Sequence, residues 1–292
     1  MQFNENCLIE IFIEVDDFCQ AFEKWEHQKF TTSSLNWKSR LSQSEALSIL
    51  IFYHHSGYKC FEYYYDRMVF SNLKSYFPTI VTHKHFLSLI PKCFELMYLF
   101  AQWKSAQSQR NGIYYVDSKR LPVCHNKRIK SNKVFKNIAQ SGKSSMGWFY
   151  GLKIHLVINN FGEIVSFLLT SANFSDNNKN VLHTLLDDLQ GHCYGDKGYL
   201  SKLFEHFYLS GLKIVTKVRK NMKNKLLPLQ EKYHLMRRGI IESVNDILMT
   251  VCDIEHTRHR SPQNAMTHMI GAIAAYAFLK NKPTVIMKNL IA

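Results

Sequence analysis

Apolar side chains recur at helical spacing through the first hundred residues. The stripe within residues 8–25 repeats every three or four positions, with acidic side chains on the opposite face. Further along, Ser42 and Glu45 have the spacing of a capping box ahead of an apolar run. Pro91 predicts a kink or break in a later helix, because proline removes a backbone donor. Together these patterns predict that residues 1–110 form an all-helical region.

The pattern changes after residue 110, where the apolar runs shorten and alternate with polar positions as they do in strands. A β-rich run over residues 113–116 ends at Asp117, and two alternating runs flank the turn residues 159–162. The predicted elements are strands 113–116, 148–158, 164–169, 192–194 and 213–218 and helices 177–189, 202–210, 233–252 and 262–280. This order predicts an α/β domain with a mixed sheet over residues 111–292, interrupted by a polar insert at 118–147.

The composition, 46% hydrophobic and 21% charged, supports a large buried core and excludes a wholly disordered chain. Lys and Arg number 37 against 23 Asp and Glu, a net charge of +14, which attracts polyanions such as nucleic acid. The most apolar stretch is shorter than the roughly 20 residues of a membrane span. The acidic N-terminus is unlike a secretory signal. We therefore expect a cytoplasmic, DNA-associated protein with no membrane partner.

Basic side chains are concentrated in the insert 118–147, which holds eight Lys or Arg residues and no acid. Such a run is usually a solvated loop, and the net charge favours a nucleic-acid-binding surface as the alternative. A second basic stretch leads from the last predicted strand toward residue 238. The candidate DNA-binding residues are Lys119, Arg120, Lys127, Arg128, Lys130, Lys133, Lys136, Lys197, Lys217, Arg219, Lys220 and Arg237.

Three acidic residues stand where a catalytic site would gather them. Asp117 and Asp196 each end a predicted strand, and functional side chains in open α/β sheets cluster beyond the carboxyl ends of strands. Glu242 lies in the predicted helix 233–252, one turn after Arg238. Carboxylates are ligands of Mg²⁺, and a pair of such ions activates the attacking oxygen and stabilises the leaving oxygen at a phosphodiester.

Each of these residues also has an ordinary interpretation. A single Asp at a strand end is more often a solvated residue or a helix cap than a metal ligand. Arg238 and Glu242 have the spacing of a surface ion pair, which contributes only about 0.3 kcal/mol. Composition and spacing alone therefore give modest support to a nuclease-like site.

Four sequence runs resemble those of bacterial insertion-sequence DDE transposases. They are Tyr115-Val-Asp-Ser-Lys-Arg-Leu-Pro-Val-Cys124, Gly151-Leu-Lys-Ile-His155, Tyr194-Gly-Asp-Lys-Gly-Tyr199 and Arg237-Arg-Gly-Ile-Ile-Glu-Ser-Val-Asn245. The chain is most similar to the insertion-sequence 982 family, which is related to the insertion-sequence 4 type, and the resemblance covers nearly the whole chain. Each motif is weak alone, and their order makes the set fairly specific.

The resemblance implies a ribonuclease H-like catalytic core, preceded by a helical N-terminal region for DNA-end binding and oligomer contacts. It implies that Asp117, Asp196 and Glu242 coordinate two Mg²⁺ or Mn²⁺ ions, and that Arg238 steadies a phosphate or orients Glu242. The expected partners are double-stranded DNA, as terminal inverted repeats and as target, and a second copy of the chain in a homodimer.

The chain departs from the related motif of Tyr, Arg, Glu and Lys at two positions. Leu235 stands at the place of the Tyr and Met249 at the place of the Lys, whereas Arg238 and Glu242 fit. These departures put in doubt any contact with transposon ends through those two side chains, and they leave the three acids unaffected.

The predicted function is that of a DNA transposase. Water attacks a phosphodiester at the element end, and the freed 3′-hydroxyl then attacks target DNA at the same site. Three alternatives stay open from the sequence. A hydrolytic nuclease shares the core without strand transfer, an inactive relic or repressor binds DNA without cleaving it, and an RNA-binding module needs none of the three acids.

Overall fold

The computed structural model describes residues 4–29, 37–144, 146–199, 203–217, 226–255 and 259–286. By their packing the residues form two compact units, Met1–Trp103 with Leu248–Leu279 and Lys104–Ile247 with Lys280–Ala292. The first unit therefore includes a late segment of the chain, which a single boundary near residue 110 does not anticipate. Whether residues 1–110 and 111–292 act as separate functional domains stays a prediction.

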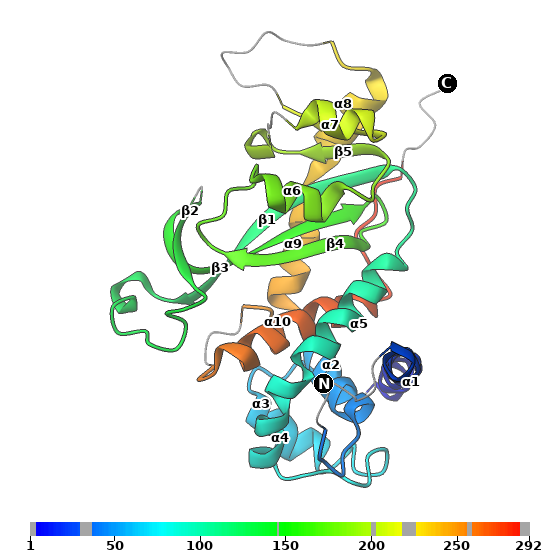
Figure 1. Cartoon of the computed structure of the whole chain (residues 1–292), viewed down its shortest axis with the longest axis vertical. Helices are drawn as coiled ribbons and strands as arrows, with labels where there is room; N and C mark the ends of the chain where they lie inside the picture. The colour runs from blue at the N-terminus through cyan, green and yellow to red at the C-terminus, as the bar shows by residue number, and fades with distance from the viewer. Residues whose placement is uncertain are drawn as a thin grey trace. The chain divides into compact units, whose positions relative to one another are not determined.

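The first unit is built from helices (Figure 1). They are α1 (Glu5–Lys29), α2 (Gln43–Ser56), α3 (Phe61–Tyr64), α4 (His83–Leu89), most of α5 (Phe94–Ala106) and α10 (Pro262–Ala277). The predicted capping box is confirmed, because Ser42 Oγ accepts from the Glu45 N–H at 3.0 Å and the Glu45 carboxylate accepts from the Ser42 N–H at 2.7 Å. Pro91 lies in a 3-10 turn, Ile90–Cys93, between α4 and α5, where the sequence predicts the break.

The second unit is organised by a six-stranded mixed sheet (Figure 1). Its strands are β1 (Ile113–Cys124), β2 (Gln140–Ser144), β3 (Gly147–Asn159), β4 (Ile164–Ser171), β5 (Gly191–Gly195) and β6 (Leu212–Thr216). The order is β2-β3-β1-β5-β6, with β1 antiparallel to β3 and parallel to β5. On its other edge β3 pairs first with β2 and then with β4.

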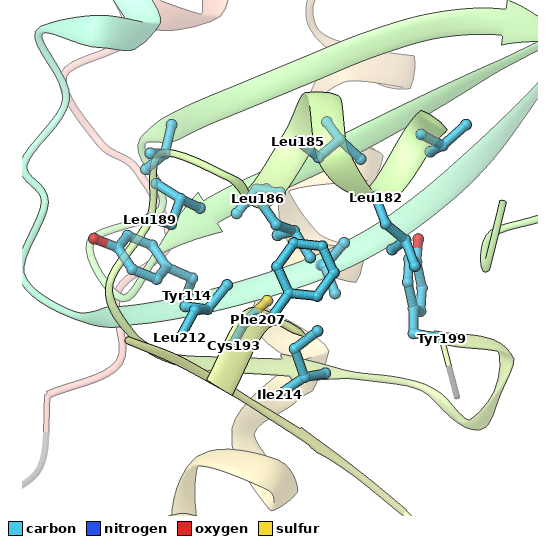
Figure 2. Packing of buried hydrophobic residues seen from close by; sticks show 14 residues of the cluster. Tyr114, Leu182, Leu185, Leu186, Leu189, Cys193, Tyr199, Phe207, Leu212 and Ile214 are labelled. Atoms are coloured by element: carbon cyan, nitrogen blue, oxygen red, sulfur yellow. The ribbon is translucent and has the colours of Figure 1, made fainter. Parts of the chain in front are cut away.

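Helices α6 (Lys179–Leu186) and α7 (Phe204–Leu209) supply one side of a hydrophobic core against this sheet. Figure 2 shows Leu182 and Leu186 of α6 and Phe207 of α7 beside Cys193 of β5 and Ile214 of β6. Side chains of β1 complete the cluster from the central strand. This packing holds the first half of β1, through Tyr114 and Val116, in a fixed relation to Cys193 of β5.

Two predicted elements differ from the observed ones. The predicted helix 233–252 is two helices, α8 (Leu229–Met236) and α9 (Ile240–Thr250), joined by a 3-10 turn at Arg237–Gly239. Glycine is a weak helix former, which explains a break there and puts Glu242 in the first turn of α9. The insert 118–147 is not a continuous loop, because β1 runs on to Cys124 and β2 lies within it.

Candidate functional site

Asp117 lies in the middle of β1 with its side chain half-buried. Burial raises the pKa of its carboxyl from 3.8 to about 6. A backbone hydrogen bond from Ser118 and the guanidinium of Arg238 lower this pKa, whereas the carboxylates of Asp176 and Glu242 raise it. Asp117 is therefore a partly desolvated acid among other charged groups. It is not the solvated residue at a strand end that the ordinary interpretation of the sequence describes.

Glu242 lies in the first turn of α9 and forms an ion pair with Arg238. Arg238 Nη2 donates to Glu242 Oε1 at 3.3 Å, with side-chain exposures of 16% for Arg238 and 61% for Glu242. The same helix face carries Asp246, whose Oδ1 lies 3.8 Å from Lys119 Nζ. Lys119 is two residues beyond Asp117 on β1, so the two side chains point to the same side of the sheet. Helix α9 therefore runs along the face of β1 that presents Asp117.

Asp196 is exposed and follows the last residue of β5. Tyr194 of β5 pairs in parallel with Tyr115 of β1, so two further residues lead to Asp196, just after β5, and to Asp117. Asp117 lies within β1 and not at its end as the sequence predicts, because β1 continues to Cys124. Gly195 lets the strands approach closely, because a Cβ there would lie 3.0 Å from the Val116 side chain.

Asp176 is a further acid near Asp117, and sequence analysis missed it. It lies in the turn between β4 and α6. Ser118 Oγ donates to Asp176 Oδ1 at 2.7 Å, and Lys153 Nζ donates to the same oxygen at 3.2 Å. The second oxygen, Oδ2, faces Gly198 of the loop after Asp196, 3.5 Å from where a Cβ would stand. One carboxylate thus connects β1, β3 and the loop that carries Asp196.

Lys153 and His155 belong to the motif 151–155 and point to one face of β3. The Lys153 side chain is buried, and its ammonium also donates to the Phe174 carbonyl at 2.8 Å. Burial lowers the pKa of His155 to about 4, so its imidazole is neutral at neutral pH, with Nδ1 3.9 Å from Asp176. A buried ammonium is stable only when paired, so Asp176 is the counter-charge that Lys153 requires.

The spacing of the acids differs from that of a single-ion site. Among the described residues, one group of His, Cys, Asp and Glu has its ligand atoms all within 4.8 Å of one another, and it is His183, Asp187 and His206 on the surface of α6 and α7. The three predicted acids are spread more widely. Their charges repel in the absence of a cation, and a pair of ions about 4 Å apart needs ligands over a larger span.

The predicted DNA-binding residues lie mainly in solvent. The insert exposes Lys127, Arg128, Lys130, Lys133 and Lys136, and exposed residues near the ends of other elements are Lys197, Lys217 and Arg237. On β1, Lys119 and Arg120 are half-buried. Arg219 and Lys220 lie outside the described residues.

A family model described as a transposase DDE domain matches residues 107–262, more than half of the chain. The matched segment contains all six strands and the residues Asp117, Asp176, Asp196, Arg238 and Glu242. Neither the curated proteins nor the solved structures give a match to this chain.

The raised pKa of Asp117 predicts how the metal-free protein responds to pH. Its carboxyl binds a proton more tightly in the folded chain, near pH 6, than in the unfolded chain, near pH 3.8, so stability falls as the pH rises between these values. Asp117→Asn removes this cost and is expected to raise the free energy of unfolding by about 2 kcal/mol above about pH 7.

Urea denaturation in a chelator measures the effect. The gain from Asp117→Asn is expected to vanish as the pH falls below about 4, where the wild-type carboxyl is protonated in both states. Mn²⁺ is expected to stabilise the wild type and to lose that effect in the variant. Equal stability of the two proteins at neutral pH would show that Asp117 is an ordinary solvated acid.

Proposed function

Because the chain belongs to the transposase DDE domain family, we propose that it is the DNA transposase of an insertion sequence. In this proposal it hydrolyses a phosphodiester at each end of the element and joins the freed 3′-hydroxyl to target DNA. The observation that carries the proposal is the electrostatic coupling of Asp117 with Glu242 and Arg238, which come from distant segments of the sequence.

A ribonuclease H-like core is supported by the strand order. Apart from β2, the order is β4-β3-β1-β5-β6, an antiparallel trio followed by two parallel strands reached through α6 and α7. The first acid lies on the central strand, the second follows the neighbouring strand, and the third lies on a helix after the sheet. We assign the helical residues 1–110 to DNA-end binding and to contacts within a homodimer.

The three proposed ligands suit divalent cations because of the charge around Asp117. Burial and two neighbouring carboxylates oppose ionisation of Asp117, and a cation among Asp117, Asp196 and Glu242 would offset that cost. Carboxylate oxygens are the ligands that Mg²⁺ and Mn²⁺ take. Two such ions, when bound, polarise the scissile phosphate, activate the attacking oxygen and stabilise the leaving one.

The chain's own residues orient these acids. Arg238 donates to Glu242 and keeps further N–H groups for a phosphate oxygen, so we assign it to both tasks. Asp176 is a positioning residue in this proposal. Through Ser118 and Lys153 it fixes the part of β1 that carries Asp117.

Double-stranded DNA is the proposed partner, as terminal inverted repeats and as target. The exposed Lys and Arg residues of the insert supply phosphate contacts without any acid among them. Within the described residues no helix has the length and apolar character needed to cross a membrane.

Two assays separate the alternatives. A transposase joins a labelled, pre-cleaved DNA end to a target duplex, whereas a hydrolytic nuclease cuts without joining. An inactive relic binds DNA and leaves it uncut in Mg²⁺. An RNA-binding module prefers RNA of the same length and is insensitive to changes in the three acids.

Loss of any one of the three acids is expected to abolish Mg²⁺-dependent cleavage. Asp117→Asn, Asp196→Asn and Glu242→Gln keep the side-chain shape and remove a metal-binding charge. DNA affinity, measured by mobility shift, is expected to stay close to that of the wild type, since the phosphate contacts come from other residues.

Asp246→Asn is the matched control, because Asp246 lies one turn from Glu242 on the same helix face. It is expected to cleave at the wild-type rate. Robust cleavage by one of the three site variants would remove that residue from the proposed site.

Arg238 has a distinct expected signature at saturating DNA and Mg²⁺. Arg238→Lys keeps the charge and loses the planar fork, so the cleavage rate is expected to fall about tenfold, and Arg238→Ala about a hundredfold. The control is the exposed neighbour Arg237→Ala, which is expected to weaken binding and leave the saturated rate unchanged. A wild-type rate in Arg238→Ala would make the Arg238–Glu242 contact an ordinary ion pair.

Asp176 is expected to act on metal affinity. Asp176→Ala removes the partner of Ser118 and Lys153, and the Mn²⁺ concentration for half-maximal cleavage is expected to rise about tenfold. Asp176→Asn keeps an acceptor oxygen and is expected to recover part of the loss. The control is Asp188→Ala, an exposed acid after α6. A lower melting temperature with unchanged Mn²⁺ dependence would reduce Asp176 to a structural residue.

A further inference from the structure

Strands β1, β2 and β3 extend beyond the rest of the sheet as an arm, which comprises residues 119–144 and 146–148 and projects past α6 in Figure 1. At its base Gly151 lets β3 approach β1, because a Cβ there would lie 2.2 Å from the Leu121 carbonyl oxygen. Main-chain pairing of β3 with β1 and β2 therefore anchors the arm to the sheet.

The segment of the arm between β1 and β2 is folded. Phe135 and Ala139 are buried, and Asn132 Oδ1 accepts from the Phe135 N–H at 3.1 Å. Asn126 Nδ2 donates to the Trp148 carbonyl at 2.8 Å, which ties the start of the segment to β3. The arm therefore holds its outer side chains in defined positions.

The arm contains no acidic residue. Its exposed basic residues are Lys127, Arg128, Lys130, Lys133, Lys136 and Lys143. Lys143 stands opposite Trp148 in the β2–β3 register, so their Cβ atoms are about 5 Å apart. A positively charged surface of this kind binds the phosphates of a nucleic-acid backbone.

Among the described residues of the arm, three apolar side chains lie exposed on this basic surface, those of Val134, Met146 and Trp148. Trp148 is 64% exposed and Met146 is 75% exposed. Within the part of the chain that the structure describes, no aromatic ring stacks on the Trp148 indole. Phosphate contacts alone need only cations, so the exposed indole indicates a second type of contact on the same ligand.

We propose that Trp148 stacks on an unpaired DNA base while the lysines and arginines of the arm hold the adjacent phosphates. Base faces are hidden inside a duplex stack, so a base freed from pairing at a DNA end is the ligand that fits an exposed indole. The choice of DNA rests on the proposed function. The contact itself is independent of the acids, because it involves neither metal nor cleavage.

Binding in a chelator tests the proposal with two fluorescent probes. One is a blunt duplex, and the other is the same duplex with a single-stranded 3′ extension of thymidines and one 2-aminopurine. For the extended duplex, Trp148→Ala is expected to raise Kd about tenfold and Trp148→Phe about threefold, since a phenyl ring keeps part of the stacking. Blunt-duplex binding is expected to change less than about twofold.

Tyr208→Ala is the control, since Tyr208 is a 66% exposed aromatic residue of α7 and belongs to none of the segments assigned to DNA binding. It is expected to bind both probes as the wild type does. The 2-aminopurine fluorescence is expected to be quenched by the wild type and by Tyr208→Ala, and to recover in Trp148→Ala.

Two outcomes would overturn the proposal. Equal weakening on both probes would mean that Trp148 contacts paired DNA, as an intercalating wedge does. An unchanged Kd for the extended duplex would mean that Trp148 makes no contact. If the wild type instead fails to cleave DNA in Mg²⁺, the proposed function fails and the stacking result stands separately.

Discussion

Strand β1 pairs antiparallel with β3 over Tyr114–Cys124 and parallel with β5 over Ile113–Tyr115, and this pairing determines what surrounds Asp117. Because alternate residues of a strand face opposite sides, Asp117 and Ser118 serve different faces of the sheet. Asp117 faces α9, where Glu242 and Arg238 modify its pKa. Ser118 binds Asp176 on the opposite side.

The candidate site is negative within a strongly basic chain. Asp117, Asp176 and Glu242 repel one another, and the positive groups that meet them are Arg238 and the buried Lys153. Burial is the main cause of the raised pKa of Asp117, and the carboxylates of Asp176 and Glu242 add to it. A site with this excess of negative charge favours a divalent cation over a closed ion-pair network.

Three residues of the candidate site could be located from local sequence, and their role stays a proposal. Asp117 and Asp196 follow short apolar runs, and Glu242 follows an arginine at helical spacing, so the chain signals their positions. The capping box at Ser42 was equally local, since both partners lie within one turn. Such features can be predicted from the sequence because the interacting residues are close along the chain.

Long-range contacts could not be predicted in this way. Asp176 meets Ser118 across 58 residues, and its own surroundings indicate only a turn. The motif at residues 151–155 indicated a strand. The charge partner of Lys153 could not be predicted from it, because Asp176 is positioned by the pairing of β4 with β3. The break at Arg237–Gly239 was missed because the apolar periodicity continues through it.

The most direct test of the account counts metal ions at the acids. Electron paramagnetic resonance of Mn²⁺ bound to the protein–DNA complex reports both the number of ions and their coupling. About two coupled ions per site are expected in the wild type, and their loss is expected in Asp117→Asn, with DNA still bound. Uncoupled or absent Mn²⁺ in the wild type, or the same signal in Asp117→Asn, would contradict it.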